Sequence, residues 1–381
     1  MKGIRICFIG IFVITLLVFF ANTITSNKPI SDVEKRDLAM FPKLSEIKNS
    51  DYFDKVTSAF SDQLYRRETL VRYYYYMQFQ RYLGDVVEGK DGEMFSAVQY
   101  PQDIDDYTAE MMVAIEDLNK LSEELKANNA QLIFLSIPRK DAYMEEYLPK
   151  TYTSSRERYN YGMQLLRDNL NSDIVIIDGL EVFNEHKDEY HYYFKTDHHI
   201  NVRGGELLYK EVMKEVSKKY DVKIYELEDL YEIHEATVNG SFNKQVGQSV
   251  ELNKEELYLT LKDDFNYTRY EWDVISDLPV WGKGLDYATA FMSGDRGYTR
   301  IETNREKLPN VMYVGSSFTN VLEALTIPSV NRMVSIDYRN NGTGTSIVDY
   351  VKKNKINYVV LVPAQSNNAL DGEKIELHIG N

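Results

Sequence analysis

The N-terminal hydrophobic pattern differs from that of the rest of the chain, because residues 6–27 carry no charge and residues 6–21 are almost all apolar. At about 1.5 Å per residue, these 22 uncharged positions could span roughly 30 Å of hydrocarbon. Lys2 and Arg5 precede the stretch, which predicts a cytoplasmic N-terminus and an exported remainder. We therefore expect residues 1–27 to be a transmembrane anchor. A cleaved signal peptide has a similar pattern, but Ala21-Asn22-Thr23 is a poor cleavage site.

Residues 28–100 are expected to form a helical arm and a hairpin. Residues 51–83 predict one long helix rich in Tyr and Arg, which includes the run Tyr73-Tyr74-Tyr75-Tyr76. We expect the tyrosine rings to pack against the body of the protein. The alternative interpretation is that they form a surface on which carbohydrate stacks. Residues 86–95 then place an Asp-Gly turn between two short apolar runs, which is typical of a β-hairpin.

Residues 101–381 show the alternation of an α/β domain. Apolar residues at 104, 107, 111, 115, 118, 121 and 125 follow one face of an amphipathic helix. Short apolar runs that fit buried parallel strands occur at 132–137, 174–177, 311–314, 333–336 and 358–362. Further helices are expected at about 154–170, after Asn201, at 318–327 and at 345–354. This order predicts a doubly wound and mostly parallel α/β sheet that is covered on both faces.

The alternation of predicted strands and helices is interrupted at about residues 220–308. Leu257, Leu259 and Leu261 alternate as in a strand, and Gly and Asp punctuate the remainder. We interpret this segment as a large, partly β insertion that packs beside the sheet and over the functional site.

Charge and cysteine content narrow the classes of function. The net charge of −15 argues against nucleic acid as a partner, because phosphate binding needs a basic surface. The single cysteine, Cys7, lies in the apolar N-terminal segment and can form neither an internal disulfide nor a thiolate zinc site.

Two segments carry residues suited to catalysis, and the first is Asp197-His198-His199. It stands before a helix for which Asn201 is the expected N-cap. An Asp two residues before a His can accept a hydrogen bond from Nδ1 of that ring and fix its tautomer as a base. Asp197 and His199 fit these roles, which leaves His198 as a packing or supporting residue.

The second segment is Gly315-Ser316-Ser317, which connects a buried strand to a helix. This position exposes a hydroxyl at the carboxyl edge of the sheet, where α/β sites lie. The N–H groups of the following helix are suited to stabilising an oxyanion. Small residues at such turns are most often structural, but in combination with the first segment they predict a triad of Ser317, His199 and Asp197.

The chain resembles the DHHW proteins, relatives of the alginate acetylation proteins in the SGNH hydrolase superfamily. The resemblance rests on Asp197-His198-His199 with Lys195-Thr196 before it, and on the later serine block at 315–318. Ordinary SGNH esterases have the reverse order, with the serine first. Residues 36–42, 88–92, 138–149 and 358–363 are similar too, so the resemblance covers most of the chain after residue 28.

Two positions depart from the family pattern. Ile200 stands where the family name has Trp, and Ser316 stands where the serine block usually has Asp. Alignment on Gly315 and Phe318 favours Ser317 over Ser316 as the nucleophile.

The resemblance implies O-acetylation, or acyl transfer, on an extracytoplasmic polysaccharide. The expected partner is a membrane-bound O-acyltransferase that supplies acyl groups across the bilayer. His199 would remove the Ser317 proton, Ser317 would carry the acyl group, and Asp197 would orient His199. The implied mechanism needs no metal and no organic cofactor.

Further candidates to contact substrate or an oxyanion lie just after predicted strands. They are Ser316, Asn320, Arg139, Lys140, Tyr338, Arg339 and Gln365. For each of them a purely structural or solubility role in a loop is an equal alternative.

Several rival functions use the same residues. Asp197, His198 and His199, with His186 or His191 nearby, are metal-ligand types, although three adjacent residues rarely point at one ion. A DHH phosphoesterase would need upstream Asp motifs that this chain lacks. A plain esterase would use the same triad with water as the acceptor. A non-catalytic polysaccharide-binding subunit of an export complex is a further alternative from a different class.

Overall fold

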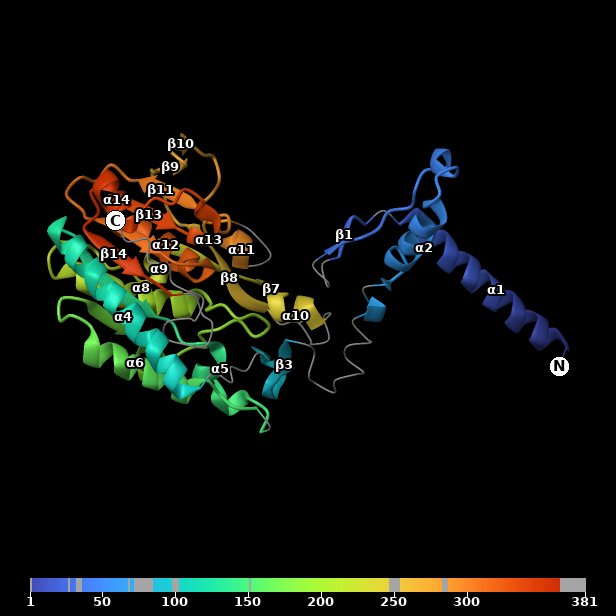
Figure 1. Cartoon of the computed structure of the whole chain (residues 1–381), viewed down its shortest axis with the longest axis horizontal. Coiled ribbons are helices and arrows are strands. Elements are labelled where there is room, and N and C mark those ends of the chain that lie inside the picture. Colours follow the sequence, from blue (N-terminus) through green and yellow to red (C-terminus); the bar gives the residue numbers. More distant parts are fainter. Residues whose placement is uncertain are drawn as a thin grey trace. The chain divides into compact units, whose positions relative to one another are not determined.

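The computed structural model describes residues 2–26, 28–31, 36–67, 69–71, 85–97, 103–150, 152–246, 254–282 and 287–363. By its internal contacts the chain divides into two units. The first comprises Met1–Val87 with Ser241–Glu251, and the second comprises Glu88–Gly240 with Leu252–Asn381. The second unit contains the α/β sheet and both segments suited to catalysis (Figure 1).

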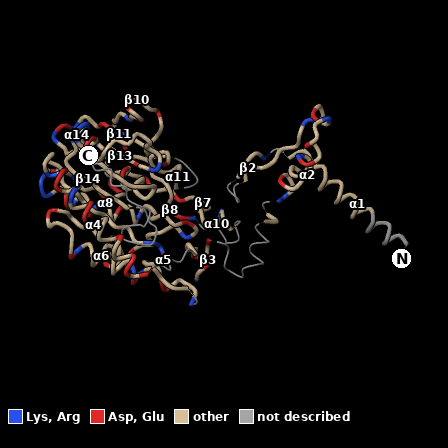
Figure 2. Tube along the Cα trace, in the orientation of Figure 1, with Lys and Arg blue, Asp and Glu red and all other residues tan. Residues whose placement is uncertain are grey.

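The first unit is mostly helical. Its described elements are α1 (Lys2–Thr25), β1 (Ile30–Ser31), β2 (Arg36–Asp37), α2 (Tyr52–Asp62) and α10 (Ser241–Val246), with β1 and β2 paired antiparallel. Figure 2 shows no Lys, Arg, Asp or Glu along the part of α1 that is coloured by residue type. In the described part of the chain, however, no helix is both long and apolar enough to cross a membrane. The transmembrane anchor expected at residues 1–27 is therefore not confirmed.

The prediction of one continuous helix over 51–83 is wrong, because α2 ends at Asp62. The side chain of Gln63 accepts a hydrogen bond from the Ser26 hydroxyl and donates to the carbonyl oxygens of Lys28 and Ala39. The backbone then reaches a left-handed conformation at Arg66, with φ of 55°, which a continuous α-helix does not allow. The four-tyrosine run at 73–76 lies outside the described residues.

The second unit is built on an eight-stranded sheet in the order β10-β9-β11-β13-β12-β14-β5-β6. The five strands β13, β12, β14, β5 and β6 are parallel, and β11, β9 and β10 extend the sheet in antiparallel fashion. The parallel strands are β5 (Gln131–Ser136), β6 (Val175–Asp178), β12 (Asn310–Val314), β13 (Arg332–Ile336) and β14 (Tyr358–Leu361). The predicted doubly wound, mostly parallel sheet is thus confirmed, with an antiparallel edge that was not predicted.

Helices lie between the strands much as the pattern predicts. They are α4 (Ile104–Ala127), α5 (Lys140–Tyr143), α6 (Arg156–Asn169), α7 (Gly179–Glu185), α8 (Val202–Ser217), α12 (Asn320–Thr326), α13 (Tyr338–Asn341) and α14 (Ile347–Asn354). The hairpin expected at 86–95 is formed by β3 (Val86–Glu88) and β4 (Met94–Ser96). Figure 1 shows α4 and α6 lying together along one side of the second unit.

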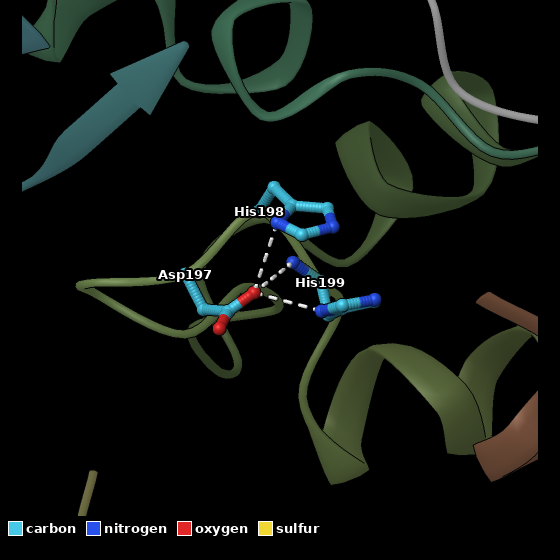
Figure 3. A group of neighbouring side chains, drawn as sticks. All are labelled: Asp197, His198 and His199. Atoms are coloured by element: carbon cyan, nitrogen blue, oxygen red, sulfur yellow. Dashed lines mark hydrogen bonds and ion pairs between the residues drawn. The ribbon is translucent and has the colours of Figure 1, made fainter. Parts of the chain in front are cut away.

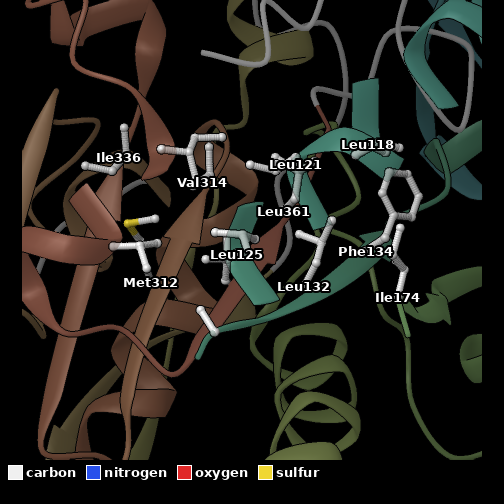
Figure 4. Close-up of a cluster of buried hydrophobic side chains, with 14 of the residues drawn as sticks. Leu118, Leu121, Leu125, Leu132, Phe134, Ile174, Met312, Val314, Ile336 and Leu361 are labelled. Carbon is white, nitrogen blue, oxygen red and sulfur yellow. The ribbon is translucent and has the colours of Figure 1, made fainter. Parts of the chain in front are cut away.

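The core is packed on both faces of the sheet. Leu132 and Phe134 of β5 join Leu118, Leu121 and Leu125 of α4 in one buried cluster (Figure 4). The alternate residues Ile133 and Leu135 are also fully buried, although side chains alternate between the two faces of a strand. Helices therefore cover both sides, as they do in doubly wound sheets. On α8, a Cβ at Gly205 would lie 2.6 Å from Val321, so this glycine allows α8 and α12 to pack closely.

The segment expected as an insertion is divided between two β structures. Its elements are α9 (Leu227–Leu230), β7 (Tyr231–Thr237), β8 (Lys254–Leu261), β9 (Thr268–Glu271), β10 (Val274–Ile275), α11 (Tyr287–Ala290) and β11 (Tyr298–Glu302). Strands β7 and β8 form their own antiparallel pair, whereas β9, β10 and β11 belong to the main sheet. The segment is thus partly β, as expected, but half of it continues the sheet instead of lying beside it.

Candidate active site

The Ser317 hydroxyl stands at the carboxyl end of β12, which lies between β13 and β14 in the parallel block. The chain leaves the strand at Gly315, where a Cβ would lie 2.6 Å from Thr319 and 2.9 Å from the Val362 carbonyl oxygen, so only glycine fits. A short 3-10 turn, Ser317–Thr319, then leads into α12. Ser317 is partly exposed, whereas Ser316 is buried and its carbonyl oxygen accepts hydrogen bonds from Thr319. This environment favours Ser317 over Ser316 as the accessible hydroxyl.

The Asp197 and His199 side chains come from the loop before α8. An antiparallel bridge between Tyr193 and Ile200 closes this loop, and the Asn201 side chain caps α8 by accepting from the N–H groups of Arg203 and Gly204. The N-cap predicted at Asn201 is therefore present. Ile200, at the position that the family name gives to Trp, is fully buried.

One oxygen of Asp197 organises both histidines (Figure 3). Asp197 Oδ1 lies 2.7 Å from His199 Nδ1 and 3.2 Å from His198 Nδ1, and it accepts a hydrogen bond of 3.1 Å from the backbone N–H of His199. Because an ionised carboxylate can only accept, Nδ1 of His199 carries the proton. In the neutral ring Nε2 is then the acceptor.

Ser317 lies at that acceptor nitrogen. Its Oγ is 2.8 Å from His199 Nε2, although the two residues are 118 positions apart in the sequence. Asp197, His199 and Ser317 therefore form one continuous hydrogen-bonded chain. The two separate segments are brought together in the arrangement that a serine nucleophile and its general base require.

A residue of the expected insertion completes this arrangement. The Tyr287 ring stacks on the His199 ring with a centroid separation of 4.1 Å and an interplanar angle of 12°, and its hydroxyl donates a 2.7 Å hydrogen bond to the Ser317 carbonyl oxygen. The rings of His198 and Phe318 also contact His199, at 3.9 and 4.8 Å between centroids. Tyr287 was not predicted as a site residue, because no local sequence signal distinguishes it from other aromatic residues in a turn-rich segment.

His198 is chemically distinct from its neighbour. Burial, followed by the proximity of His199, lowers the pKa of His198 to about 4. Near neutral pH it is therefore uncharged, which fits the supporting role expected for it.

Behind the serine turn lies a buried carboxyl, that of Glu323 on α12. Its Oε1 accepts hydrogen bonds from the hydroxyls of Thr319 and Ser335. Burial raises its pKa to about 7. Glu323 thus links the turn to β13 without touching Ser317.

The remaining predicted candidates that the structure describes are held by protein partners. Asn320 donates to Asp295 at 3.0 Å, and Arg339 binds the carboxylates of Asp295 and Asp337. Asn320, Arg339 and Asp295 therefore form one cluster beside the serine turn. The Tyr338 hydroxyl donates to the Thr345 carbonyl oxygen.

Arg139, Lys140 and Gln365 have different outcomes. Arg139 pairs with Asp141 through a 2.6 Å contact from Nε, and its charge is among those that lower the pKa of His198. Lys140 is buried and donates to the carbonyl oxygens of Phe194 and Lys195, just before Asp197, so it supports the loop from within. Gln365 lies outside the described residues.

Asp197, His198 and His199 also offer ligand atoms that lie within 4.8 Å of one another, and this is the chemistry of the metal alternative. Both Nδ1 atoms, however, point at the same carboxylate oxygen at hydrogen-bond distance, and His199 Nε2 is directed at Ser317. These contacts account for all three side chains as a hydrogen-bonded group.

The fold and the arrangement of its side chains define an SGNH hydrolase-like α/β protein. Residues 86–258 match the family described as the SGNH hydrolase-like domain of the acetyltransferase AlgX. The chain thus contains an AlgX-like SGNH hydrolase domain over these residues, which make up less than half of its length. The resemblance to the DHHW and alginate acetylation proteins is confirmed at this level. No curated protein matches the chain.

Solved structures show the same fold. PatB1 from Bacillus cereus is 23% identical, with a TM-score of 0.59 over 73% of this chain and 94% of that chain. PatB1 carrying a sulfonyl adduct gives 21% identity and the same TM-score over 73% and 93%. A DHHW family protein from Eubacterium siraeum is 21% identical, with a TM-score of 0.55 over 73% and 89%.

Proposed function

We propose that this protein is an extracytoplasmic O-acyltransferase, in particular an O-acetyltransferase, that modifies a polysaccharide through an acyl-Ser317 intermediate. The single observation that carries the proposal is the hydrogen-bonded chain from Asp197 through His199 to Ser317, with links of 2.7 and 2.8 Å. The match to a family of SGNH-like acetyltransferases supports transfer as the outcome.

The first half-reaction loads the serine. Ser317 Oγ attacks the carbonyl carbon of the donor ester while His199 Nε2 takes the hydroxyl proton. The tetrahedral intermediate then collapses, the bond to the leaving alkoxide breaks, and His199 returns the proton to that oxygen. The products are acyl-Ser317 and the free alcohol of the donor.

The second half-reaction transfers the acyl group from Ser317 to the acceptor. A sugar hydroxyl takes the place of the departed alcohol, loses its proton to His199 Nε2 and attacks the acyl carbon. Ser317 Oγ leaves and recovers the proton, so the enzyme returns to its starting state. Asp197 keeps the His199 ring in the tautomer that both steps need and stabilises the imidazolium formed in each.

The oxyanion of each intermediate needs hydrogen-bond donors near Ser317. We assign this role to the backbone N–H groups at the start of the Ser317–Thr319 turn, each of which could contribute about 3 kcal/mol of transition-state stabilisation. The Asn320 amide is directed at Asp295 and would have to turn to take part.

The acyl donor and the cellular location belong to the same proposal. A membrane-bound O-acyltransferase would deliver acyl groups from the cytoplasm, since the apolar N-terminal sequence predicts that the rest of the chain is exported. Hydrolysis is the competing outcome, in which water replaces the sugar hydroxyl and the protein acts as an esterase.

The direct test compares the full-length protein with Ser317→Ala and His199→Ala on a chromogenic acetyl ester. Each variant should lose activity by about 10³-fold or more, because a triad acts as a unit. Ser316→Ala is the matched control and should retain most of the activity. A sulfonyl fluoride, chosen because PatB1 carries a sulfonyl adduct, should label the protein unless Ser317 is replaced.

Full activity in both triad variants would refute the serine mechanism. An activity that depends on bound metal and survives Ser317→Ala would favour the metal alternative. With an oligosaccharide added, acetylated sugar as the main product indicates transfer, and free acetate alone indicates an esterase. Glycan binding without either reaction would indicate the non-catalytic subunit.

A further inference from the structure

A cavity of about 440 Å³ lies in the second unit beside the loop that carries Asp197 and His199. Lys195 and Asn201, which stand two positions outside these residues, contribute to its lining, whereas Ser317 does not. The cavity is therefore close to the candidate active site along the chain but separate from the nucleophile. Its volume falls in the range of small-molecule sites.

One wall of the cavity is an aromatic ring held in place. Tyr190 is 50% exposed, and the Arg203 guanidinium carbon lies 4.4 Å from the centroid of its ring. Glu256 binds Arg203 through two contacts of 2.8 and 3.1 Å, and Glu228 adds a third of 2.7 Å. A half-exposed ring whose neighbour is fixed is a ready surface for stacking.

Two of the lining residues, Glu93 and His191, form a charged cluster with Lys140 that the proposed mechanism does not use. Lys140 Nζ lies 2.8 Å from Glu93 Oε2 and donates to two carbonyl oxygens at 2.7 Å. His191 places Nε2 3.3 Å from Glu93 Oε1 and Nδ1 2.8 Å from the Tyr193 carbonyl oxygen. Glu93 and Lys140 are both buried, and removing such charges from water costs several kcal/mol per ion, so a gain in stability does not explain this ion pair.

The contacts of His191 favour its protonated form. Both of its ring nitrogens face acceptors, so both carry protons in the cationic form. Burial lowers the pKa of His191, but the hydrogen bond and the charge of Glu93 outweigh burial, and the net shift is upward.

The charges that line the cavity nearly cancel. The carboxylates are those of Glu93, Glu235, Glu255 and Glu256. The cations are those of Lys195, Arg203 and Lys254, to which protonated His191 adds a fourth. An anionic ligand would meet four carboxylates, and a cationic ligand would meet four positive groups. Interleaved donors and acceptors beside a stacking ring instead suit a neutral ligand rich in hydroxyl groups.

We propose that this cavity binds neutral sugar units of a glycan, apart from the position where the acyl group is transferred. The inference deepens the proposed function, on which it rests, by naming a polymer-binding site and the residue that anchors it, Tyr190. A sugar ring stacks on Tyr190 while its hydroxyls bond to the flanking carboxylates and to Lys195.

The test measures binding without catalysis. Full-length Ser317→Ala is titrated with xylotetraose and with tetra-N-acetylchitotetraose by calorimetry. We expect at least one neutral sugar to bind, and Tyr190→Ala in the same background to weaken binding about tenfold. Tyr190→Phe keeps the ring and should bind nearly as well. Tyr161→Ala, which removes a 36% exposed tyrosine from α6, is the matched control and should change nothing.

The outcomes separate this inference from the proposed function. Equal binding by Tyr190→Ala and its parent, or no binding of either neutral sugar, would overturn the inference. Preference for a polygalacturonate oligomer over both neutral sugars would also overturn it. With the active serine restored, Tyr190→Ala should hydrolyse a small acetyl ester at the wild-type rate. A loss of ester activity in Ser317→Ala thus reports on the proposed function alone.

Discussion

Tyr287 shows how one side chain outside the predicted motifs can set the geometry of the site. Its ring lies nearly parallel to His199 and its hydroxyl holds the Ser317 carbonyl oxygen, so it contacts both segments of the candidate triad. Tyr287 does not touch the reacting atoms itself. It is therefore a positioning residue, whose role is to keep Nε2 of His199 facing Ser317 Oγ.

Two substitutions of Tyr287 should lower kcat to different extents. Tyr287→Phe keeps the stacked ring and loses one hydrogen bond of about 1 kcal/mol, so kcat should fall severalfold. Tyr287→Leu also removes the ring contact, worth roughly 1 kcal/mol more, and kcat should fall by tens of fold. Steady-state kinetics on a small acetyl ester measure both effects.

A control separates positioning from stability. The measurements are made well below the melting temperature of each variant, and KM for the small ester should change much less than kcat. If Tyr287→Leu lowered the melting temperature but left kcat unchanged, the ring would be packing only.

At the scale of elements, the junction between α12 and β13 is built around an acidic group. Glu323 is 1% exposed, and the hydroxyls of Thr319 and Ser335 bind the same carboxyl oxygen from the serine turn and from β13. Leu322 and Val321 beside it are buried apolar residues. A carboxyl in this position makes the packing of α12 depend on pH.

Glu323 should make the folded state less stable as the pH rises. Burial raises its pKa from an ordinary value of 4.5 to about 7, so the folded state binds this proton more tightly than the unfolded state. Its contribution is complete below about pH 4.5 and is lost as the pH rises through about 7. The loss is on the order of 3 kcal/mol in the free energy of unfolding.

Urea unfolding of wild type and Glu323→Gln at pH 5 and pH 8 measures this contribution. Between the two pH values, wild type should lose stability relative to Glu323→Gln, because the amide does not ionise. Glu116→Gln, at an exposed position of α4, is the control and should follow wild type. Parallel pH dependences of wild type and Glu323→Gln would show that the buried carboxyl does not ionise in this range.

For the whole molecule, the parallel part of the sheet was predictable because its strands are continuous apolar runs. Residues 311–314 and 358–361 are examples, and they became β12 and β14. The antiparallel edge was not predictable. Thr268–Glu271 and Tyr298–Glu302 are short and contain charges, and Arg269 is buried only because Glu271 and backbone carbonyl oxygens of distant residues bind its guanidinium.

The candidate site likewise contains residues that could be predicted from the sequence and residues that could not. Asp197 and His199 lie two positions apart before a capped helix, and Ser317 follows a buried strand, so each carries a local signal. Tyr287 and Asp295 reach the site only through the fold of the 220–308 segment, and the sequence around these two residues has no periodic pattern. Sequence reasoning could therefore identify the groups proposed for chemistry but not those that position them.

Export of the catalytic unit is the property of the whole molecule that the proposed function most requires. Cys7 is the only cysteine, so a single introduced thiol can report where the remainder of the chain lies. In a Cys7→Ser background, Lys352→Cys places that thiol on α14 at an exposed position.

If residues after 27 are exported, a membrane-impermeant maleimide should label Lys352→Cys in intact cells whose outer layers admit the reagent. Cys7→Ser alone should stay unlabelled, and a cytoplasmic protein bearing a surface cysteine should be labelled only after lysis. Labelling of Lys352→Cys only after lysis would place the unit in the cytoplasm and leave no route to an extracytoplasmic polysaccharide.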